Sequence, residues 1–276
     1  MSNKIIICAI IIIICIMGIG IGIYAQFFYV NSNEDKFMLG LGEEAEKKET
    51  RKELELNFEN IFQNSVKIVQ VPDKTNKEDE TKEIIYTDTD FVAEKAGYYD
   101  IDINIPKINI NSETIENVNN NITSLYTELA KEILLQQEQH NIIYNVDYEG
   151  YINQNILSLV IKATIKQDKD VQRTIIKTYN YEINENKELT LQEIIEIKNL
   201  NENAIQNEIT QKIEEYNKEN LSLNILGYEG HVRDAENEMY EIENAENFFL
   251  GEDGFLYIVY SYGNKEETNL IDIIVI

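Results

Sequence analysis

The chain has 276 residues, of which 50 are acidic and 24 basic, so its formal net charge is −26. Hydrophobic residues make up 43% of the chain, which is enough for a core and excludes disorder throughout. A surface of this sign repels nucleic acid and anionic lipid, and it attracts cationic partners. Nucleic-acid binding is therefore excluded as a function.

Both cysteines, Cys8 and Cys15, lie in an apolar run near the N-terminus. The rest of the chain has no thiol, which excludes a disulfide framework or a cysteine-ligated metal there. Lipidation of a cysteine is a less favoured alternative, because it would need a small residue just before it and Ile7 and Ile14 occupy those positions.

Residues 5–25 form an apolar run of about 21 residues, which as a helix reaches ~30 Å, the thickness of the hydrocarbon layer. The apolar region of a cleaved signal peptide is usually shorter. Ala25, with Ile23 two residues before it, makes a poor cleavage site, and the aromatic residues at 24 and 27–29 suit the membrane surface. The sequence predicts a retained transmembrane helix, with cleavage as the alternative.

The charges on either side of this run predict its orientation. Lys4 precedes it, and Glu34 and Asp35 are the first charged residues after it. Positive charge favours the cytoplasmic side. We therefore expect a single-pass protein of the cell membrane, with a cytoplasmic tail at residues 1–4 and an extracytoplasmic C-terminal domain.

Residues 26–95 are predicted to hold a juxtamembrane helix and a variable segment. Leu54, Phe58, Ile61 and Phe62 recur at helical spacing. Extended segments are expected at 66–71 and 84–92, with a polar loop at 72–83 between them.

Residues 96–276 show the more regular pattern. Apolar residues alternate with Asp and Asn over 99–105, which predicts a strand that Pro106 closes. Ser112 suits a helix N-cap. The helix that follows has an apolar stripe at spacings of three and four, formed by Ile115, Val118, Ile122, Leu125, Leu129 and Ile133.

Three β-rich runs at 142–152, 156–166 and 173–183 are predicted to form an antiparallel meander. Thr190 and Glu193 form a capping box that opens a short helix, and Asn201 opens another. This second helix carries Ile205, Ile209, Ile213 and Tyr216 on one face.

The C-terminal runs at 248–250 and 255–262 predict a hairpin, and the run at 270–276 predicts a last strand. The fold class is therefore predicted to be α+β, an antiparallel sheet with helices packed on it, preceded by one N-terminal transmembrane helix.

Four segments carry a resemblance to a known family: YYDIDINIPKI (98–108), NILSLVIKATI (155–165), RTIIKTYNYEINENKELTLQEII (173–195) and FFLGEDGFLYIVYSYG (248–263). They resemble the extracytoplasmic domain of RsiV-like membrane proteins, a module that also precedes the deacetylase domain of PdaC-like enzymes. The resemblance spans roughly residues 96–276. Its strongest elements, besides the closing hairpin, are Tyr179, Asn180, Leu189 and Leu191.

The resemblance implies the outer domain of an anti-sigma factor, which binds lysozyme. The sigma-binding segment of such proteins lies on the cytoplasmic side, where residues 1–4 are expected here. The deacetylase domain of PdaC-like enzymes would follow residue 276. We therefore expect an RsiV-like extracytoplasmic domain at 96–276 without the anti-sigma segment or the deacetylase domain.

Catalytic groups are sparse in the sequence. His140 and His231 are its only histidines, the first at a predicted helix end and the second in the loop sequence GYEGHVRD. Ser158, which would need a histidine as its base, lies inside an apolar strand. The group formed by His231, Arg233 and Asp234 is interpreted as a solvated loop. We expect no enzyme activity and no catalytic residues.

Pairs of carboxylates on one face of an extended chain can bridge Ca²⁺. Such pairs arise by chance among 50 acidic residues, so we expect neither a metal site nor a cofactor. The pairs are Asp88 with Asp90, Asp100 with Asp102, and Asp168 with Asp170.

The chain has 17 tyrosines and no tryptophan. Tyrosine packs well on strands, so the tyrosines of the predicted strands are interpreted as sheet packing, with a glycan-binding face as the alternative. They are Tyr144, Tyr148, Tyr151, Tyr179 and Tyr181.

Together these features predict a membrane-anchored extracytoplasmic binding or sensing protein of the bacterial cell envelope. Its span contacts membrane lipid, and its expected partner is a cationic protein such as lysozyme, which the resemblance implies, or a cell-wall component. A cell-wall-modifying enzyme, or an accessory to one, and a structural envelope protein are the alternatives.

Overall fold

A computed structural model of the chain describes residues 62, 66–68, 75–136, 138–228, 230–262 and 270–276. The chain divides into two compact units, Met1–Lys48 and Glu49–Ile276, and every described residue belongs to the second. The predicted cytoplasmic tail, the transmembrane helix at 5–25 and all of the juxtamembrane helix except Phe62 lie outside the described residues. Within the described part, no helix is long and apolar enough to cross a membrane.

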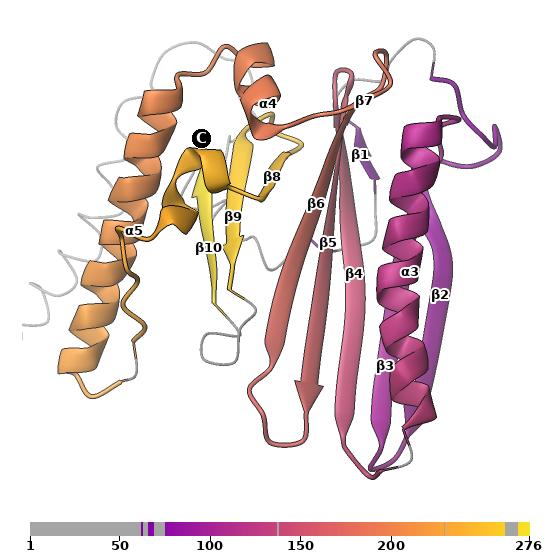
Figure 1. The fold of residues 1–276 in the computed structure, drawn as a ribbon, viewed down its shortest axis with the longest axis horizontal. Helices are drawn as coiled ribbons and strands as arrows, with labels where there is room; N and C mark the ends of the chain where they lie inside the picture. Colours follow the sequence, from indigo (N-terminus) through magenta and orange to yellow (C-terminus); the bar gives the residue numbers. More distant parts are fainter. Residues whose placement is uncertain (1–61, 63–65, 69–74, 137, 229, 263–269) are drawn as a thin grey trace, which may run out of the picture. The chain divides into compact units, whose positions relative to one another are not determined.

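Within the described residues, the larger of two sheets has seven strands in the order β2-β3-β4-β5-β6-β7, with β1 paired to β4 (Figure 1). The helix α3, Glu113–Leu135, packs on one face of this sheet. The strands are β1 Val66–Ile68, β2 Ile85–Lys95, β3 Tyr99–Ile108, β4 Ile142–Asn153, β5 Ile156–Gln167, β6 Arg173–Glu182 and β7 Lys187–Glu188.

The predicted antiparallel meander is confirmed for β4, β5 and β6. The prediction of a wholly antiparallel sheet is wrong, because β3 and β1 both pair with β4 in parallel. The reason lies in α3, whose 23 residues return the chain to the end of the sheet where β3 began. After such a crossover the next strand runs beside β3 in the same direction.

The prediction that Pro106 closes its strand is wrong, because β3 continues to Ile108. Pro106 lies opposite Thr87, where the ladder between β2 and β3 shifts register before Thr89. On the other side, β4 pairs with β3 only as far as Ile103. A proline lacks a backbone N–H, and an interrupted ladder tolerates that loss.

A second sheet holds the C-terminal strands in the order β10-β9-β8. The predicted hairpin and last strand are confirmed, but the prediction of a single sheet is wrong. The helices α4 and α5 pack on this second sheet rather than on the first. The elements are α4 Leu191–Ile197, α5 Glu202–Ile225, the 3-10 turns η3 Glu238–Tyr240 and η4 Ile242–Asn244, and the strands β8 Asn247–Leu250, β9 Leu256–Ser261 and β10 Ile271–Val275.

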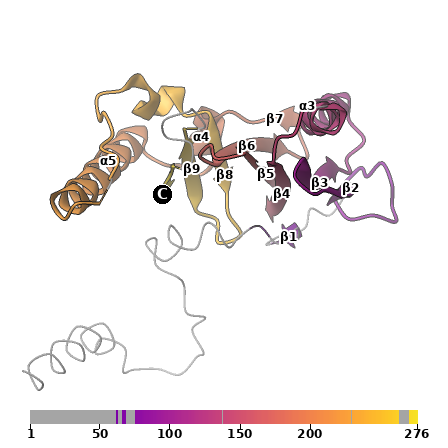
Figure 2. The same ribbon diagram turned by 90° about the horizontal axis from the view of Figure 1, so that it is seen from below.

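The two sheets meet through an apolar cluster on the face of the large sheet opposite α3 (Figure 2). Tyr151 of β4 stacks on Phe249 of β8 with ring centroids 5.5 Å apart, and Phe249 stacks on Tyr257 of β9 at 4.6 Å. Val160 and Ile176 complete the contact from β5 and β6. Successive side chains of each strand point to opposite faces of the large sheet. One face therefore packs against α3, and the other packs against the second sheet.

The predicted stripe of α3 is confirmed at Ile115, Ile122 and Ile133, and Val118 and Leu129 pack partly on the same core, but its remaining positions differ. Asn119 and Tyr126 are buried, whereas Leu125 is 52% exposed and Leu129 is half-buried. The Asn119 side chain accepts from the backbone N–H of Ile108 and donates to its carbonyl oxygen, both at 2.9 Å, which satisfies the end of β3. The observed stripe is Ile115, Asn119, Ile122, Tyr126, Ala130 and Ile133.

This arrangement of buried residues predicts different losses of stability for aspartate substitutions at two positions three residues apart. Ile122→Asp should lower the free energy of unfolding by several kcal/mol, because it buries an unpaired charge among apolar side chains. Leu125→Asp should cost under about 1 kcal/mol, as expected of an exposed position. Urea unfolding followed by circular dichroism measures both, and equal losses would contradict the observed phase.

Candidate functional site

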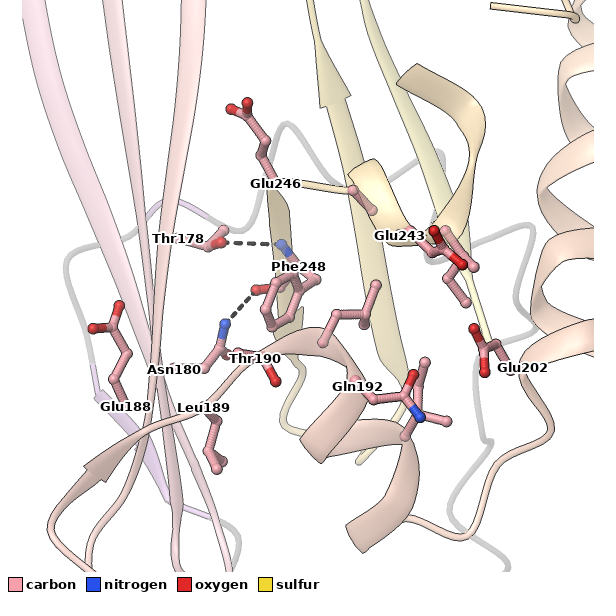
Figure 3. Close-up of a pocket in the computed structure, with 14 residues that line it drawn as sticks. Thr178, Asn180, Glu188, Leu189, Thr190, Gln192, Glu202, Glu243, Glu246 and Phe248 are labelled. Carbon is pink, nitrogen blue, oxygen red and sulfur yellow. Dashed lines mark hydrogen bonds between the residues drawn. The ribbon is translucent and has the colours of Figure 1, made fainter. Parts of the chain in front are cut away.

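The candidate site is a cavity of about 870 Å³ between β6 and β7, the helix α4, and the segment that leads from η4 into β8 (Figure 3). We call it the acidic pocket. Its floor is formed by apolar side chains of the core in which α4 and α5 pack on the second sheet, namely Leu189, Leu191, Ile195, Ile242 and Phe248. Its lining also holds four glutamates and no lysine or arginine among the described residues.

The four glutamates come from different elements. Glu202 of α5 and Glu243 of η4 lie together on one side of the pocket, while Glu188 of β7 and Glu246 lie nearer the large sheet (Figure 3). Glu246 has a cation near it, since its carboxylate lies 3.9 Å from Lys177 Nζ. Glu202 lies in the first turn of α5, where the helix dipole stabilises a carboxylate.

The wall formed by α4 is set by a capping box, as predicted from Thr190 and Glu193. Thr190 Oγ1 accepts from the Glu193 N–H at 3.3 Å, and the Glu193 carboxylate accepts from the Thr190 N–H at 2.9 Å. Bonds from Lys187 and from the Thr190 N–H lower the pKa of Glu193. The box fixes the entry of α4 and thereby the pocket residues on its first turn.

On the opposite wall, side chains of the large sheet bond the backbone of β8. Thr178 Oγ1 accepts from the Phe248 N–H at 3.0 Å, and Asn180 Nδ2 donates to the Phe248 carbonyl oxygen at 2.7 Å (Figure 3). Ser158 Oγ accepts from the Leu250 N–H at 3.1 Å and donates to Asn180 Oδ1 at 2.7 Å. These three side chains take the place of a neighbouring strand, and we call them the β8 junction.

Ser158, weighed as a nucleophile from the sequence, is therefore fully buried and already engaged in structure. Its interpretation as a strand residue is confirmed. Asn180, one of the strongest elements of the family resemblance, belongs to the same junction, where it bonds the Phe248 carbonyl oxygen.

The interpretation of His231, Arg233 and Asp234 as a solvated loop is wrong for Arg233, which is buried. Its guanidinium forms a two-point ion pair with Asp272 of β10, with Nε 2.7 Å from Oδ2. Tyr262 donates to the same Oδ2 at 2.7 Å, and the Tyr216 ring lies 4.9 Å from the guanidinium. The partner of Arg233 stands 39 residues away in sequence, which no local pattern indicates.

His140 lies on the surface, where its Nδ1 is 2.8 Å from Asp168 Oδ2 and its Nε2 is 3.3 Å from Glu138 Oε2. Asp168 also accepts from the Asn141 N–H at 2.8 Å, a bond that joins the residue before β4 to the residue after β5. Neither His140 nor His231 is among the lining residues of the acidic pocket.

The paired aspartates do not meet a third ligand, since the described residues hold no group of three or more metal-ligating side chains. The interpretation of the tyrosines as packing is confirmed for Tyr144, Tyr148, Tyr151 and Tyr181, which are buried, and for Tyr179, which packs on the large core. Burial raises the pKa of Tyr144 and of Tyr151 above the usual value.

Two solved structures are similar to this chain. One is a DUF3298 family protein from Pseudomonas aeruginosa PAO1, with 10% identity, a TM-score of 0.40, and coverage of 75% of this chain and 92% of that one. The other is a member of the same family from Bacteroides fragilis NCTC 9343, with 12% identity, a TM-score of 0.37, and coverage of 74% and 92%. No family model matches the chain, and no curated protein matches its sequence. A likeness of this degree carries no statement about ligand or activity.

The β8 junction predicts a contrast between two asparagines on strands. Asn180→Leu should lower the free energy of unfolding by about 2–5 kcal/mol, because it leaves the buried Phe248 carbonyl oxygen without a donor and the buried Ser158 O–H without an acceptor. Asn145→Leu, on an exposed position of β4, is the matched control and should change it by under about 1 kcal/mol. Urea titration of both variants measures the difference, and a nearly neutral Asn180→Leu would contradict the junction's role.

His140 generates a pH prediction. Its bond to Asp168, and then the one to Glu138, raise its pKa above the usual value. Its contribution to stability is therefore present below the usual histidine pKa and is lost as the pH rises through the raised value. The Asn141 N–H, and then His140, lower the pKa of Asp168, whose contribution is lost as the pH falls through that lowered value.

An NMR titration of the His140 ring tests this pair. Asp168→Asn should move the pKa of His140 back toward the usual value, whereas Asp170→Asn in the same turn should leave it unchanged. Equal shifts in the two variants would show that general charge, rather than the bond to Asp168, raises the pKa.

Proposed function

We propose that the chain is a membrane-anchored extracytoplasmic binding or sensing protein of the bacterial cell envelope, and that its acidic pocket receives a cationic side chain of the partner. The observation that supports this most is the pocket's lining. Four glutamates surround its apolar floor, and no lysine or arginine of the described part of the chain lines it.

Lysine and arginine side chains match such a lining in two parts. Their aliphatic stems lie along apolar surface while their charged heads remain in a polar setting. In the acidic pocket the stem would lie on Leu189 and Ile242, and the head would meet the carboxylates of Glu202 and Glu243. Charge-assisted bonds of this kind are about twice as strong as those between neutral groups.

The charge of the whole chain supports the same class of partner. A net charge of −26 raises the rate of encounter with a cationic protein above the ordinary ~10⁵–10⁶ M⁻¹s⁻¹. Lysozyme is basic, and the resemblance to RsiV-like outer domains suggests it as the partner. An amine-bearing component of the cell wall presents the same chemistry. Binding rather than catalysis is proposed, because Ser158 is engaged in the β8 junction.

Titration calorimetry of the full chain in a neutral detergent tests the partner. At ~0.5 M salt, screening shortens the range of interaction between exposed charges to a few ångströms. Lysozyme should still bind under these conditions, and a second small basic protein should be released. If lysozyme were also released, its attraction would be nonspecific, and the receptor proposal would be refuted.

The role of the pocket is tested by comparing two double variants, each of which removes two negative charges. Glu202→Gln with Glu243→Gln should weaken lysozyme binding at least about tenfold, since each charge-assisted bond contributes about 1.5–3 kcal/mol. Glu132→Gln with Glu219→Gln removes the same charge from exposed positions on α3 and α5, and should weaken it less than about threefold. Equal losses would assign the binding to the general field rather than to the pocket.

A further inference from the structure

The last two turns of α5 extend beyond the core that holds the rest of the helix. Its buried residues are Ile205, Ile209 and Ile213, all in the first half, and Tyr216 packs partly on the same core. Every residue from 221 to 228 is exposed.

This exposed end is apolar. Ile225 is 86% exposed, Leu226 71% and Tyr228 66%. No charged residue occurs between Asn220 and Tyr228, although 27% of the chain is charged. Contiguous exposed apolar side chains are uncommon on soluble domains and mark interaction surfaces. We call the group the α5 tip; its members are Leu221, Leu223, Ile225, Leu226, Tyr228 and the nearby Val232.

The α5 tip is an ordered structure. Gly227 has a φ of +87°, and its N–H bonds the Asn224 carbonyl oxygen at 3.1 Å while the Tyr228 N–H bonds the Leu223 carbonyl oxygen at 3.0 Å. This pair of bonds is a Schellman motif, which ends a helix and turns the chain sharply away.

Two asparagines of α5 then hold the returning chain. Asn224 bonds both the N–H and the carbonyl oxygen of Gly230, at 2.7 and 2.9 Å. Asn217 does the same to Arg233, also at 2.7 and 2.9 Å. The apolar side chains of the tip are therefore presented by a fixed turn rather than by a frayed helix end.

The α5 tip and the acidic pocket lie at opposite ends of α5 (Figure 1). Glu202, in the first turn, lines the pocket, and Leu226 caps the helix 24 residues later. At ~1.5 Å per residue this separation is about 36 Å along the helix axis.

We propose that the α5 tip inserts into the surface of the lipid bilayer to which the chain is anchored. Aliphatic side chains with a tyrosine, at a projecting helix end whose residues 221–228 carry no charge, suit the boundary between headgroups and acyl chains. Docking would hold the acidic pocket at the end of α5 that is remote from the membrane.

Two further observations favour lipid over a second copy of the chain. Residues 26–61 separate the predicted span from Phe62 and can extend on the order of 100 Å, so the bilayer is within reach at a high effective concentration. A second copy of the chain would bring another net charge of −26 against the first, which opposes self-association. The inference rests on the membrane anchoring proposed above.

The absence of tryptophan from the sequence allows a direct test. Ile225→Trp places a single fluorophore on the α5 tip, and Ile197→Trp places one on the exposed end of α4 as a matched control. The full-length variants are reconstituted into vesicles of zwitterionic phosphatidylcholine, with or without bromine on the acyl chains near the headgroup. Bromine quenches tryptophan only at close range.

We expect brominated lipid to lower the fluorescence of Ile225→Trp by about half or more, with a blue-shifted emission, because membrane-inserted side chains leave water. The Ile197→Trp fluorescence should stay within about a tenth of its value in ordinary lipid.

Vesicle flotation separates the two proposals. A chain that floats but whose Ile225→Trp is not quenched retains its anchor and overturns the docking of the tip. A chain that does not float overturns the anchoring and the docking together. Quenching at both positions would show that the domain lies on the bilayer without a preferred face, and a concentration-dependent blue shift without quenching would assign the tip to a second copy; both results overturn the inference.

Discussion

The side chains of Ser158, Thr178 and Asn180 bond the backbone of β8 and so join two sheets that share no strand ladder among the described residues. Without them, the backbone groups of Phe248 and Leu250 would be buried without partners, at about 1–3 kcal/mol each. The apolar cluster around Tyr151 and Phe249 adds stability, but apolar contact is not directional. The junction therefore sets how β8 lies against β6, and the acidic pocket is the space that this arrangement leaves beside α4.

A second polar connection positions α5 on the far side of the small sheet. Arg233 pairs with Asp272 of β10, and Asn217 of α5 bonds the backbone of Arg233 on both sides. A buried pair of this kind adds little net stability over an apolar pair, but removing one partner is costly. Its effect here is to fix the line of α5, and hence the places of Glu202 at one end and Leu226 at the other.

Local signals in the sequence predicted local structure well. The capping box at Thr190, the cap at Ser112 and the meander of β4 to β6 are all present. Errors arose where the answer depends on a distant partner: the direction of β3 against β4, the second sheet, and the burial of Arg233 against Asp272. Periodicity identifies a buried face but not what covers it. It also misses polar core residues such as Asn119. The pocket could not be predicted, because residues from 178 to 248 form its walls.

The distribution of charge gives the two ends of α5 opposite chemistry. The described lining of the pocket has glutamates without a basic residue, whereas residues 221–228 of the α5 tip carry no charge in a chain of net charge −26. A single tether at the N-terminus would leave such a domain free to turn, and its negative surface would not by itself seek lipid. The proposed second, apolar attachment at the end of α5 would restrict that rotation. In the proposed arrangement the helix therefore acts as a spacer, which separates the pocket from the docked tip by about 36 Å along the helix axis.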